Sequence, residues 1–187
     1  MLIATLGPSG SNHELIALRY LAKYGLAQHG QPSSHLALFD RFEAAFEALL
    51  AGRVSHVLQC TAHASHGDCV GRYMHRAFPI DAFIAASKPL AVLGRKEIAR
   101  PRSLGLQPAT RHYTDVSGYA ELIDVPTTVA VAEGLLAGHY DAGICALEYL
   151  ERYPARLRLI QALGPAMDTW VIFARQPLSA SSPLLLE

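Results

Sequence analysis

An alternation of short apolar runs with amphipathic helical patterns constrains the fold of this chain most. Leu2–Leu6 is an apolar run that stops at Gly7-Pro8, as a buried strand ended by a turn would. Ser11 stands three residues before Glu14, which is the spacing of a capping box, and residues 17–24 then carry apolar side chains at helical spacing. A strand, a turn and a helix in this order predict the first part of a parallel βαβ unit.

The same alternation continues along the whole chain. We expect the first helix to end at Gly25, and a second helix to open at Asp40 and close at Gly52. The Cys60–Cys69 segment is predicted to be a polar loop. Strands are predicted at 35–39, 55–60, 80–86, 90–94, 104–106, 121–125, 142–146, 157–163 and 170–174, and further helices at 108–119, 129–137 and 147–153.

Composition argues against several classes of function. The 187 residues, of which 51% are hydrophobic, are enough to bury a core in one domain or in two small lobes. The 16 basic residues balance 16 acidic ones without a long run of either sign, which removes the electrostatic argument for a nucleic-acid or membrane partner. No apolar stretch is long enough to span a bilayer and no export signal is visible, so we expect a cytoplasmic protein with reduced Cys60, Cys69 and Cys145.

The turn after the first strand is the first candidate site. Its glycines let the backbone approach a ligand, and the start of the following helix offers free N–H groups and a positive dipole end. Ser9, Gly10, Ser11 and Asn12 are therefore expected to bind a small anion. The alternative is an ordinary strand-to-helix turn with a serine cap.

A second candidate site has the same geometry later in the chain. Gln107, Ala109, Thr110 and Arg111 lie between a predicted strand and a predicted helix, and Thr128 follows another strand. Open α/β sheets bind ligands outside the carboxyl ends of their strands, so Thr110 and Arg111 are candidates for holding a carboxylate. The alternative is a capped helix with a solvated arginine.

The Cys60–Cys69 segment places a cysteine or histidine at every third position. Steps of three drift around a helix axis, so we expect no metal at this cluster. Cys60 ends a strand, where nucleophiles are frequent, and His63 and Asp68 follow as a possible base and orienting acid. The simpler interpretation is a polar loop in which Thr61 and Ser65 contact the ligand.

Asp168-Thr-Trp170, before the last strand, is the fourth candidate. Thr169 lies beside an acid and is a candidate proton donor, while Trp170 is a candidate for ligand contact. Core packing alone also explains a tryptophan at this place.

These turns, in this order, resemble the catalytic domain of prephenate dehydratase over roughly residues 2–175. Ile3–Ser11 is similar to that family's opening, Ile-Ala-x-Leu-Gly-Pro-x-Gly-Thr, and Leu106–Ala109 resembles its Ser-His-Pro-Gln turn. Thr127–Ala132 and Tyr140–Ile144 resemble its Ser-Thr-Ala-x-Ala-Ala and Asp-x-Ala-x-Ile segments.

The resemblance implies an α/β protein with a two-lobed fold like that of type II periplasmic binding proteins. Each lobe would be a small mixed sheet flanked by helices, with the ligand cleft between the lobes. Lobe 1 would hold residues 1–84 and 168–187 and lobe 2 residues 85–167, without the family's regulatory ACT domain. The resemblance also implies a small carboxylate substrate, no cofactor and a homodimer.

Two segments depart from the family. Cys60–Ser65 stands where the family has Pro-Ile-Glu-Asn-Ser, and Thr169-Trp-Val171 replaces its Thr-Arg-Phe, so the threonine is kept and the arginine that grips the substrate is not. Prephenate decarboxylases of antibiotic pathways resemble the chain here, because they carry Ser-Trp at this place and Tyr-Met where this chain has Tyr73-Met74.

We therefore expect a lyase that acts on prephenate or a related cyclic carboxylate in secondary metabolism, by decarboxylation without aromatisation or by dehydration. Ser9, Ser11 and Asn12 would hold one carboxylate and Thr110 with Arg111 the other, with Thr169 and His63 as proton donors. Three alternatives stay open. They are true prephenate dehydratase activity, a hydrolase or isomerase on a tropolone-type intermediate that uses Cys60 or His63, and a protein that binds carboxylates without catalysis.

Overall fold

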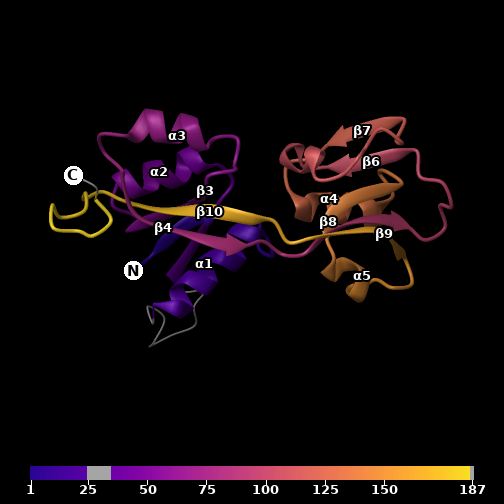
Figure 1. Cartoon of the computed structure of the whole chain (residues 1–187), viewed down its shortest axis with the longest axis horizontal. Coiled ribbons are helices and arrows are strands. Elements are labelled where there is room, and N and C mark those ends of the chain that lie inside the picture. Colours follow the sequence, from indigo (N-terminus) through magenta and orange to yellow (C-terminus); the bar gives the residue numbers. More distant parts are fainter. Residues whose placement is uncertain (25–34, 186–187) are drawn as a thin grey trace. The chain divides into compact units, whose positions relative to one another are not determined.

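The computed structural model describes residues 1–24 and 35–185, and the chain divides into two compact units (Figure 1). Unit 1 comprises Met1–Ala85 and Met167–Glu187, and unit 2 comprises Ala86–Ala166. Each unit is built on a five-stranded sheet flanked by helices, which confirms the predicted two-lobed α/β class. The predicted end of the first helix at Gly25 lies outside the described residues. Within the described ranges, no helix is long and apolar enough to cross a membrane.

The sheet of unit 1 has the strand order β2-β1-β3-β10-β4. Strand β1 pairs in parallel with both β2 and β3, as the βαβ pattern predicts, while β10 pairs antiparallel with β3 and places Trp170 opposite Cys60. The sheet is therefore mixed. Its strands are β1 (Ile3–Leu6), β2 (Leu36–Phe39), β3 (His56–Cys60), β4 (Phe78–Ala86) and β10 (Met167–Ala174).

Three helices cover the two faces of this sheet. Helix α1 (Asn12–Lys23) packs on one face, where Ile3, Leu58 and Ile172 form a core with it. Helices α2 (Phe42–Leu50) and α3 (His66–Tyr73) pack on the other face, against the neighbouring residues of the same strands. This alternation follows from the pleat, which sends successive side chains to opposite faces.

Two predictions about unit 1 are wrong. The second helix was expected to open at Asp40, but its N-cap residue is Arg41. The Arg41 side chain makes no capping hydrogen bond to α2. The segment predicted as a polar loop contains the start of α3, because Cys69 and Tyr73 lie one turn apart and bury against α2. The predicted cap at Ser11 is confirmed, since its hydroxyl accepts from the Glu14 backbone N at 3.2 Å.

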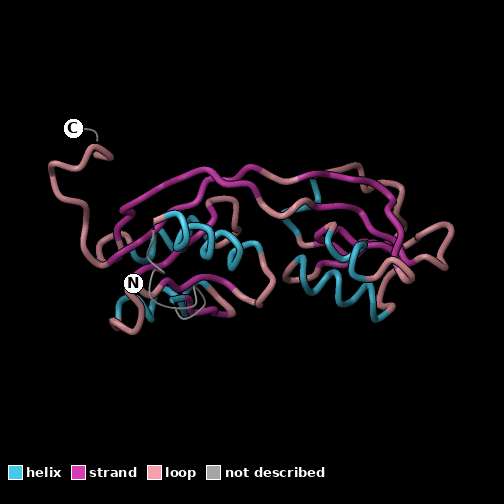
Figure 2. Tube along the Cα trace, turned by 90° about the horizontal axis from the view of Figure 1, so that it is seen from below, coloured by secondary structure: helices cyan, strands magenta, loops and turns pink. Residues whose placement is uncertain are grey.

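Unit 2 repeats the plan with the strand order β7-β6-β8-β5-β9. Strand β6 is parallel to β7 and β8, whereas β5 is antiparallel to β8 and β9. Helices α4 and α5 share one face of the sheet, as Figure 2 also shows. The elements are β5 (Leu90–Arg95), β6 (Ser103–Leu106), β7 (Glu121–Asp124), α4 (Thr128–Ala137), β8 (Ala142–Ala146), α5 (Glu148–Arg152) and β9 (Leu157–Gly164).

The helix predicted at 108–119 is wrong in kind and in length. The structure has only the 3-10 helix η2 (Pro108–His112) there, and the other face of the unit 2 sheet is packed in part by Val116 and Tyr119 from the following turns. The Asp115 carboxylate accepts from the backbone N of Ser117 at 2.9 Å, a local bond that competes with helical ones.

Close approach of α4 to β6 and β8 is mediated by Tyr140. Its hydroxyl donates to the backbone oxygen of Val131 at 2.6 Å. A Cβ added at Gly134 would lie 2.8 Å from the Tyr140 Cζ, so only glycine fits there. The Tyr140 ring thereby fixes the distance between helix and sheet.

Candidate functional site

The strand order of unit 1 identifies where a ligand would bind in it. The connection after β1 leads through α1 to β2, and the next one leads through α2 to β3 on the other side of β1. The direction in which successive connections cross the sheet thus reverses between β1 and β3. Open α/β sheets bind ligands at such a switch point, at the edge formed by the carboxyl ends of the strands. The turn Gly7–Asn12 and the segment Cys60–Ser65 both lie at this edge.

Four aromatic side chains meet at this edge, and we call them the ring cluster. His13 lies 5.1 Å from Trp170, 5.3 Å from Phe42 and 5.9 Å from His63 between ring centroids, all edge to face. Phe42 and His63 are 4.9 Å apart. His13 lies in the first turn of α1, Phe42 begins α2, His63 follows β3 and Trp170 lies on β10. Four different segments of unit 1 therefore supply one ring each.

Both imidazoles of the ring cluster are neutral near pH 7. Burial, and next the neighbouring His63, lowers the pKa of His13 to about 3. Burial also lowers the pKa of His63. The His13 Nε2 and the Trp170 Nε1 are buried and have no hydrogen-bond partner among the described residues. Buried polar atoms are normally satisfied, so the two nitrogens are available for an added hydrogen-bonding group.

The tautomer of His63 follows from its contacts with Ser65. The Ser65 backbone N donates to the His63 Nδ1 at 3.2 Å, and the Ser65 Oγ lies 2.9 Å from the same nitrogen. Because a backbone amide can only donate, Nδ1 is unprotonated and the neutral ring carries its proton on Nε2. His63 is therefore arranged as a hydrogen-bond donor through Nε2. The contacts of Ser65 with Nδ1 hold the His63 ring in this tautomer.

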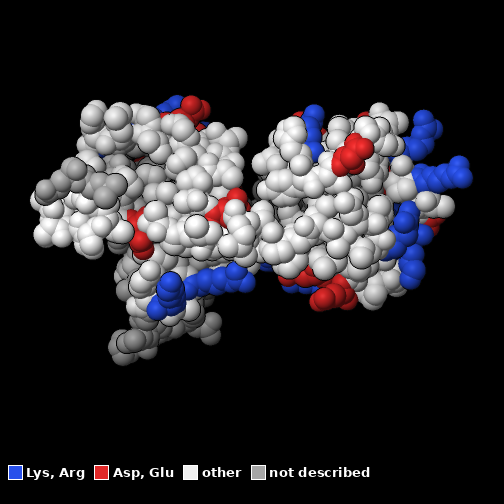
Figure 3. All heavy atoms as spheres, in the orientation of Figure 1, with Lys and Arg blue, Asp and Glu red and all other residues white. Residues whose placement is uncertain are grey.

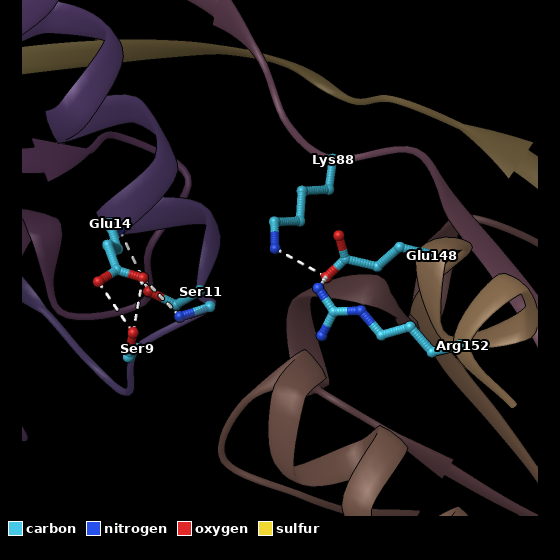
Figure 4. A network of polar contacts seen from close by, with 7 residues as sticks. Ser9, Ser11, Glu14, Lys88, Glu148 and Arg152 are labelled. Carbon is cyan, nitrogen blue, oxygen red and sulfur yellow. Dashed lines mark hydrogen bonds and ion pairs between the residues drawn. The ribbon is translucent and has the colours of Figure 1, made fainter.

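The opening turn holds a carboxylate, and it belongs to the chain itself (Figure 4). The Ser9 hydroxyl donates to the two carboxylate oxygens of Glu14 at 2.9 and 3.0 Å, and the Gly10 backbone N donates at 2.5 Å. The Ser11 hydroxyl donates to the Leu6 oxygen at 3.2 Å while it caps α1. A ligand carboxylate would have to replace Glu14 to use the donors of Ser9 and Gly10.

The start of β10 and the segment after β3 are joined by the backbone of Thr169. Its oxygen accepts from the backbone N of Thr61 at 3.0 Å and from the Thr61 Oγ1 at 3.2 Å. The Thr169 side chain is exposed at the start of β10, and Trp170 beside it is only 1% exposed. The structure thus leaves the Thr169 side chain accessible, whereas Trp170 is a core residue whose ring belongs to the ring cluster.

Cys60 does not have the environment of an activated nucleophile. Its side chain is buried, and burial is the main reason that the pKa of its thiol is raised to about 11. A nucleophilic cysteine needs a lowered pKa, so Cys60 is a neutral thiol near pH 7. Cys69 lies in the core on the opposite face of the sheet, and no group of three or more metal-ligating side chains is found in the described part of the chain.

Most of the candidate ligand-binding residues of unit 2 already have hydrogen-bond or ion-pair partners within the unit. The Gln107 Oε1 accepts from the backbone N of Ala109 at 2.9 Å, and the Thr110 Oγ1 donates to the Gln107 backbone oxygen at 2.8 Å. Arg111 forms an ion pair with Asp124 at 2.8 Å. Thr127, one residue before the predicted Thr128, caps α4 through the backbone N of Ala130.

A charged cluster that the sequence did not predict lies at the same edge of unit 2 (Figure 4). The Lys88 Nζ lies 2.9 Å from the Glu148 Oε1, and an Arg152 Nη2 lies 3.5 Å from that oxygen. Lys88 precedes β5, whose start pairs with the end of β8, and the backbone N of Leu147 donates to the Pro89 oxygen at 2.8 Å. The residues are 60 positions apart, so no local pattern could have revealed them.

A separate hollow of about 210 Å³ in unit 2 is bordered by arginines that already have partners. Arg95 contacts Glu97 and the Gly138 oxygen, and Arg156 donates to the Leu136 oxygen at the end of α4. Basic side chains gather along one side of unit 2 in Figure 3, with acidic ones among them. These arginines complete the carbonyl end of α4, so they are structural.

The fold defines a class: the chain is a two-lobed α/β protein with the architecture of prephenate dehydratase and of ligand-binding components of ABC transporters. The chain is similar to prephenate dehydratase from Arthrobacter aurescens, solved with L-Phe, at a TM-score of 0.69 and 16% identity. The similarity covers 97% of this chain and 62% of the other, so the chain spans less than two thirds of that protein.

Two further solved structures share the fold. One is GqqA, described as a quorum-quenching acylase, with a TM-score of 0.55, 15% identity and coverage of 98% of this chain and 67% of the other. The other is an ABC transporter protein from Parabacteroides distasonis, with a TM-score of 0.56, 14% identity and coverage of 92% and 65%. No protein-family model and no curated protein sequence matches the chain.

Proposed function

We propose that the protein is a lyase that acts on prephenate or a related cyclic carboxylate that bears a hydroxyl group. The observation that carries the proposal is the ring cluster at the switch point of unit 1, with the unpartnered His13 Nε2 and Trp170 Nε1. A hydroxyl group accepts from an indole N–H and donates to a neutral imidazole nitrogen, so a hydroxylated ring matches these atoms. The prephenate dehydratase fold and the motifs of the turns support the same substrate class.

The reaction requires orientation and one proton. When the ring carboxylate leaves as carbon dioxide, its bonding electron pair stays on the ring. If a donor protonates the hydroxyl, the pair expels water and phenylpyruvate forms; if a ring carbon takes the proton, the hydroxyl stays and a dihydro-hydroxyphenylpyruvate forms. Thr169, an exposed residue that precedes Trp170 in β10, and the Nε2–H of His63 are the proposed donors. Neither path needs a cofactor.

Decarboxylation without aromatisation is the outcome that the residues favour. His13 and His63 are neutral near pH 7, and a threonine hydroxyl is a weak acid, so protonation of the leaving hydroxyl has little driving force. A reaction of this kind belongs to secondary metabolism, as the likeness of Thr169-Trp170 to decarboxylases of antibiotic pathways suggests. The raised pKa of Cys60 weighs against the hydrolase alternative.

Incubation with prephenate near neutral pH tests the proposal. We expect carbon dioxide release with a dihydro-hydroxyphenylpyruvate as product, identified by ultraviolet absorbance and mass. Phenylpyruvate as the product would establish dehydratase activity, and prephenate unchanged relative to a protein-free control would refute the lyase. Thr169→Val and His63→Gln should each slow turnover about 10²-fold or more if their protons are used.

A binding protein without catalysis is the second candidate. The observation in its favour is that no carboxylate hydrogen-bonds His13 or His63 in the described structure, so the site has no acid–base pair. Thermal unfolding with and without prephenate distinguishes the two, because a ligand that binds but is not converted raises the midpoint while its concentration stays constant.

A further inference from the structure

Asp168 is an acidic residue of unit 1 whose side chain has no bonding role in the fold. It is the second residue of β10, and it is partly buried. Its carboxyl group forms no hydrogen bond or ion pair with the residues that the structure describes. Because polar groups that lose contact with water normally gain a partner, the Asp168 carboxyl group is available to a ligand.

The side chain of Asp168 lies on the same face of the sheet as the indole of Trp170. Successive side chains of a strand point to opposite faces, and burial alternates along β10, where Asp168 and Trp170 are both less exposed than Thr169 between them. Two residues of a strand rise about 6.6 Å, so both side chains can contact one ligand. Since β10 runs antiparallel to β3 and pairs Trp170 with Cys60, Asp168 lies at the carboxyl end of β3, which is the edge of the ring cluster.

The surroundings of Asp168 favour its protonated form, because burial raises the pKa of this carboxyl group. The titratable side chains of the neighbouring elements β3, α1 and β4 are His56, Cys60, His13, Glu14, Arg19, Tyr20, Lys23 and Asp81. The two cations among them, Arg19 and Lys23, are exposed and form no ion pair with Asp168. The thiol and both imidazoles are neutral near pH 7. A carboxylic acid in this setting is a much stronger acid than a threonine hydroxyl or a neutral imidazole N–H.

We propose that Asp168 gives its proton to a ring carbon of the substrate when the ring carboxylate leaves as carbon dioxide. This role rests on the proposed function, since it needs a cyclic carboxylate in the site. The bond between the ring carbon and the carboxylate breaks, and its electron pair, spread over the ring, forms a C–H bond with the proton of the Asp168 carboxyl group. The Asp168 carboxylate then takes a proton from water. The hydroxyl stays on the ring, because it is bound at the His13 Nε2 and the Trp170 Nε1 and not at Asp168.

Turnover of prephenate by Asp168→Asn, in water and in deuterium oxide, tests this role. We expect kcat to fall about 10²-fold or more and KM to stay within about threefold, because the proton is used in the transition state and not in binding. In deuterium oxide the wild type should place deuterium on one face of a single ring carbon, whereas the residual product of the variant should carry it on both faces. The wild-type kcat/KM should fall as the pH rises through the pKa of Asp168, and the variant should lack this dependence.

Two comparisons separate a proton donor from a structural residue. Asp81→Asn removes another acid of unit 1 but keeps an acceptor for the Tyr20 hydroxyl, which donates to Asp81 at 2.9 Å, so kcat should stay within about threefold of the wild type. Asp168→Asn should be at least as stable as the wild type near pH 7 in urea unfolding, because burial penalises the charged form of Asp168 and an amide carries no charge. Asp168→Glu keeps the acid and should retain more activity than Asp168→Asn.

The role of Asp168 and the proposed function can fail separately. If Asp168→Asn keeps the wild-type kcat and still places deuterium on one face, Asp168 is not the donor, while turnover by the wild type still supports the lyase. If Asp168→Asn unfolds more readily than the wild type, Asp168 supports the fold and the assignment is wrong. Prephenate that the wild type leaves unchanged would overturn both the lyase and the role of Asp168.

Discussion

The imidazole rings of His13 and His63 stand edge to face with their centroids 5.9 Å apart. Burial is the largest cause of the lowered pKa of both side chains. One histidine follows β1 and the other follows β3, so the pair lies after the two parallel strands between which the order of the connections reverses.

The stability of the protein should fall steeply in mild acid. The unfolded chain binds a proton on His13 below a pKa of 6.5, while the folded protein resists protonation down to about 3. The unfolded state therefore holds more protons in this window, and the free energy of unfolding should drop by about 1.4 kcal/mol per pH unit from His13 alone, once the pH is well below 6.5. Urea unfolding between pH 7 and 4.5 measures the slope. His13→Phe keeps a ring and should flatten the slope by about one proton.

Removing the Glu14 carboxylate should destabilise α1. Glu14→Ala takes away the group to which Ser9 and Gly10 donate and the negative charge in the first turn of the helix. We expect a loss of about 1 kcal/mol in the free energy of unfolding. Glu47→Ala on the exposed side of α2 is the matched control, with a change below about 0.5 kcal/mol. Equal losses in both variants would mean that the contacts in the turn add nothing.

Two glycine-to-alanine substitutions in helices should have opposite signs. At Gly134 in α4 the new Cβ would meet the Tyr140 ring, and the helix must move from the sheet, so we expect a loss of about 1–3 kcal/mol. At Gly71 in α3 nothing lies within 4 Å of the new atom, and alanine should stabilise the helix by about 0.5–1 kcal/mol. Thermal and urea unfolding check both. Loss of stability in Gly71→Ala would show that α3 packs differently.

Cys60 should be dispensable for turnover. Its raised pKa keeps the thiol protonated near pH 7, so Cys60→Ala should leave kcat within about threefold of the wild type and cost only a small cavity. Thiol reagents should label Cys60, Cys69 and Cys145 slowly in the folded protein, because all three are buried. A loss of about 10²-fold in kcat with unchanged unfolding would instead establish covalent catalysis.

Local patterns predicted the elements that local forces determine. The strand at 142–146 and the helix that ends at Gly138 match the structure, because a continuous apolar run and a left-handed glycine act over a few residues. The helix predicted at 108–119 is wrong because the helical turn that starts at Pro108 ends at His112. The bond from the Ser117 backbone N to the Asp115 carboxylate then forms a turn in place of a further helix. Helix α3 was missed because its register becomes visible only when Cys69 and Tyr73 meet α2.

The candidate site divides in the same way. The turns after β1 and β6 could be placed from the sequence, because strand-to-helix turns of parallel sheets share one edge. The side chains that contact these turns could not be predicted from the sequence. Glu14 fills the first turn, Asp124 holds Arg111, and His13 gains its depressed pKa from rings that are distant in the sequence. The contacts of Arg111 and His13 are tertiary, and no spacing within a segment encodes them. The bonds from Ser9 and Gly10 to Glu14 span only four or five residues, and they depend on how the turn itself folds.

Strand β10 lies between β3 and β4 in the sheet of unit 1, although more than a hundred residues separate Cys60 from its partner Trp170. During synthesis the chain of unit 2 is complete before β10 emerges, and until then β4 has no strand that joins it to β3. The last contact to form is therefore a long-range one, which is slow in kinetic terms. Since Trp170 is the single tryptophan, its fluorescence reports the closure of this sheet separately from the folding of the inserted unit.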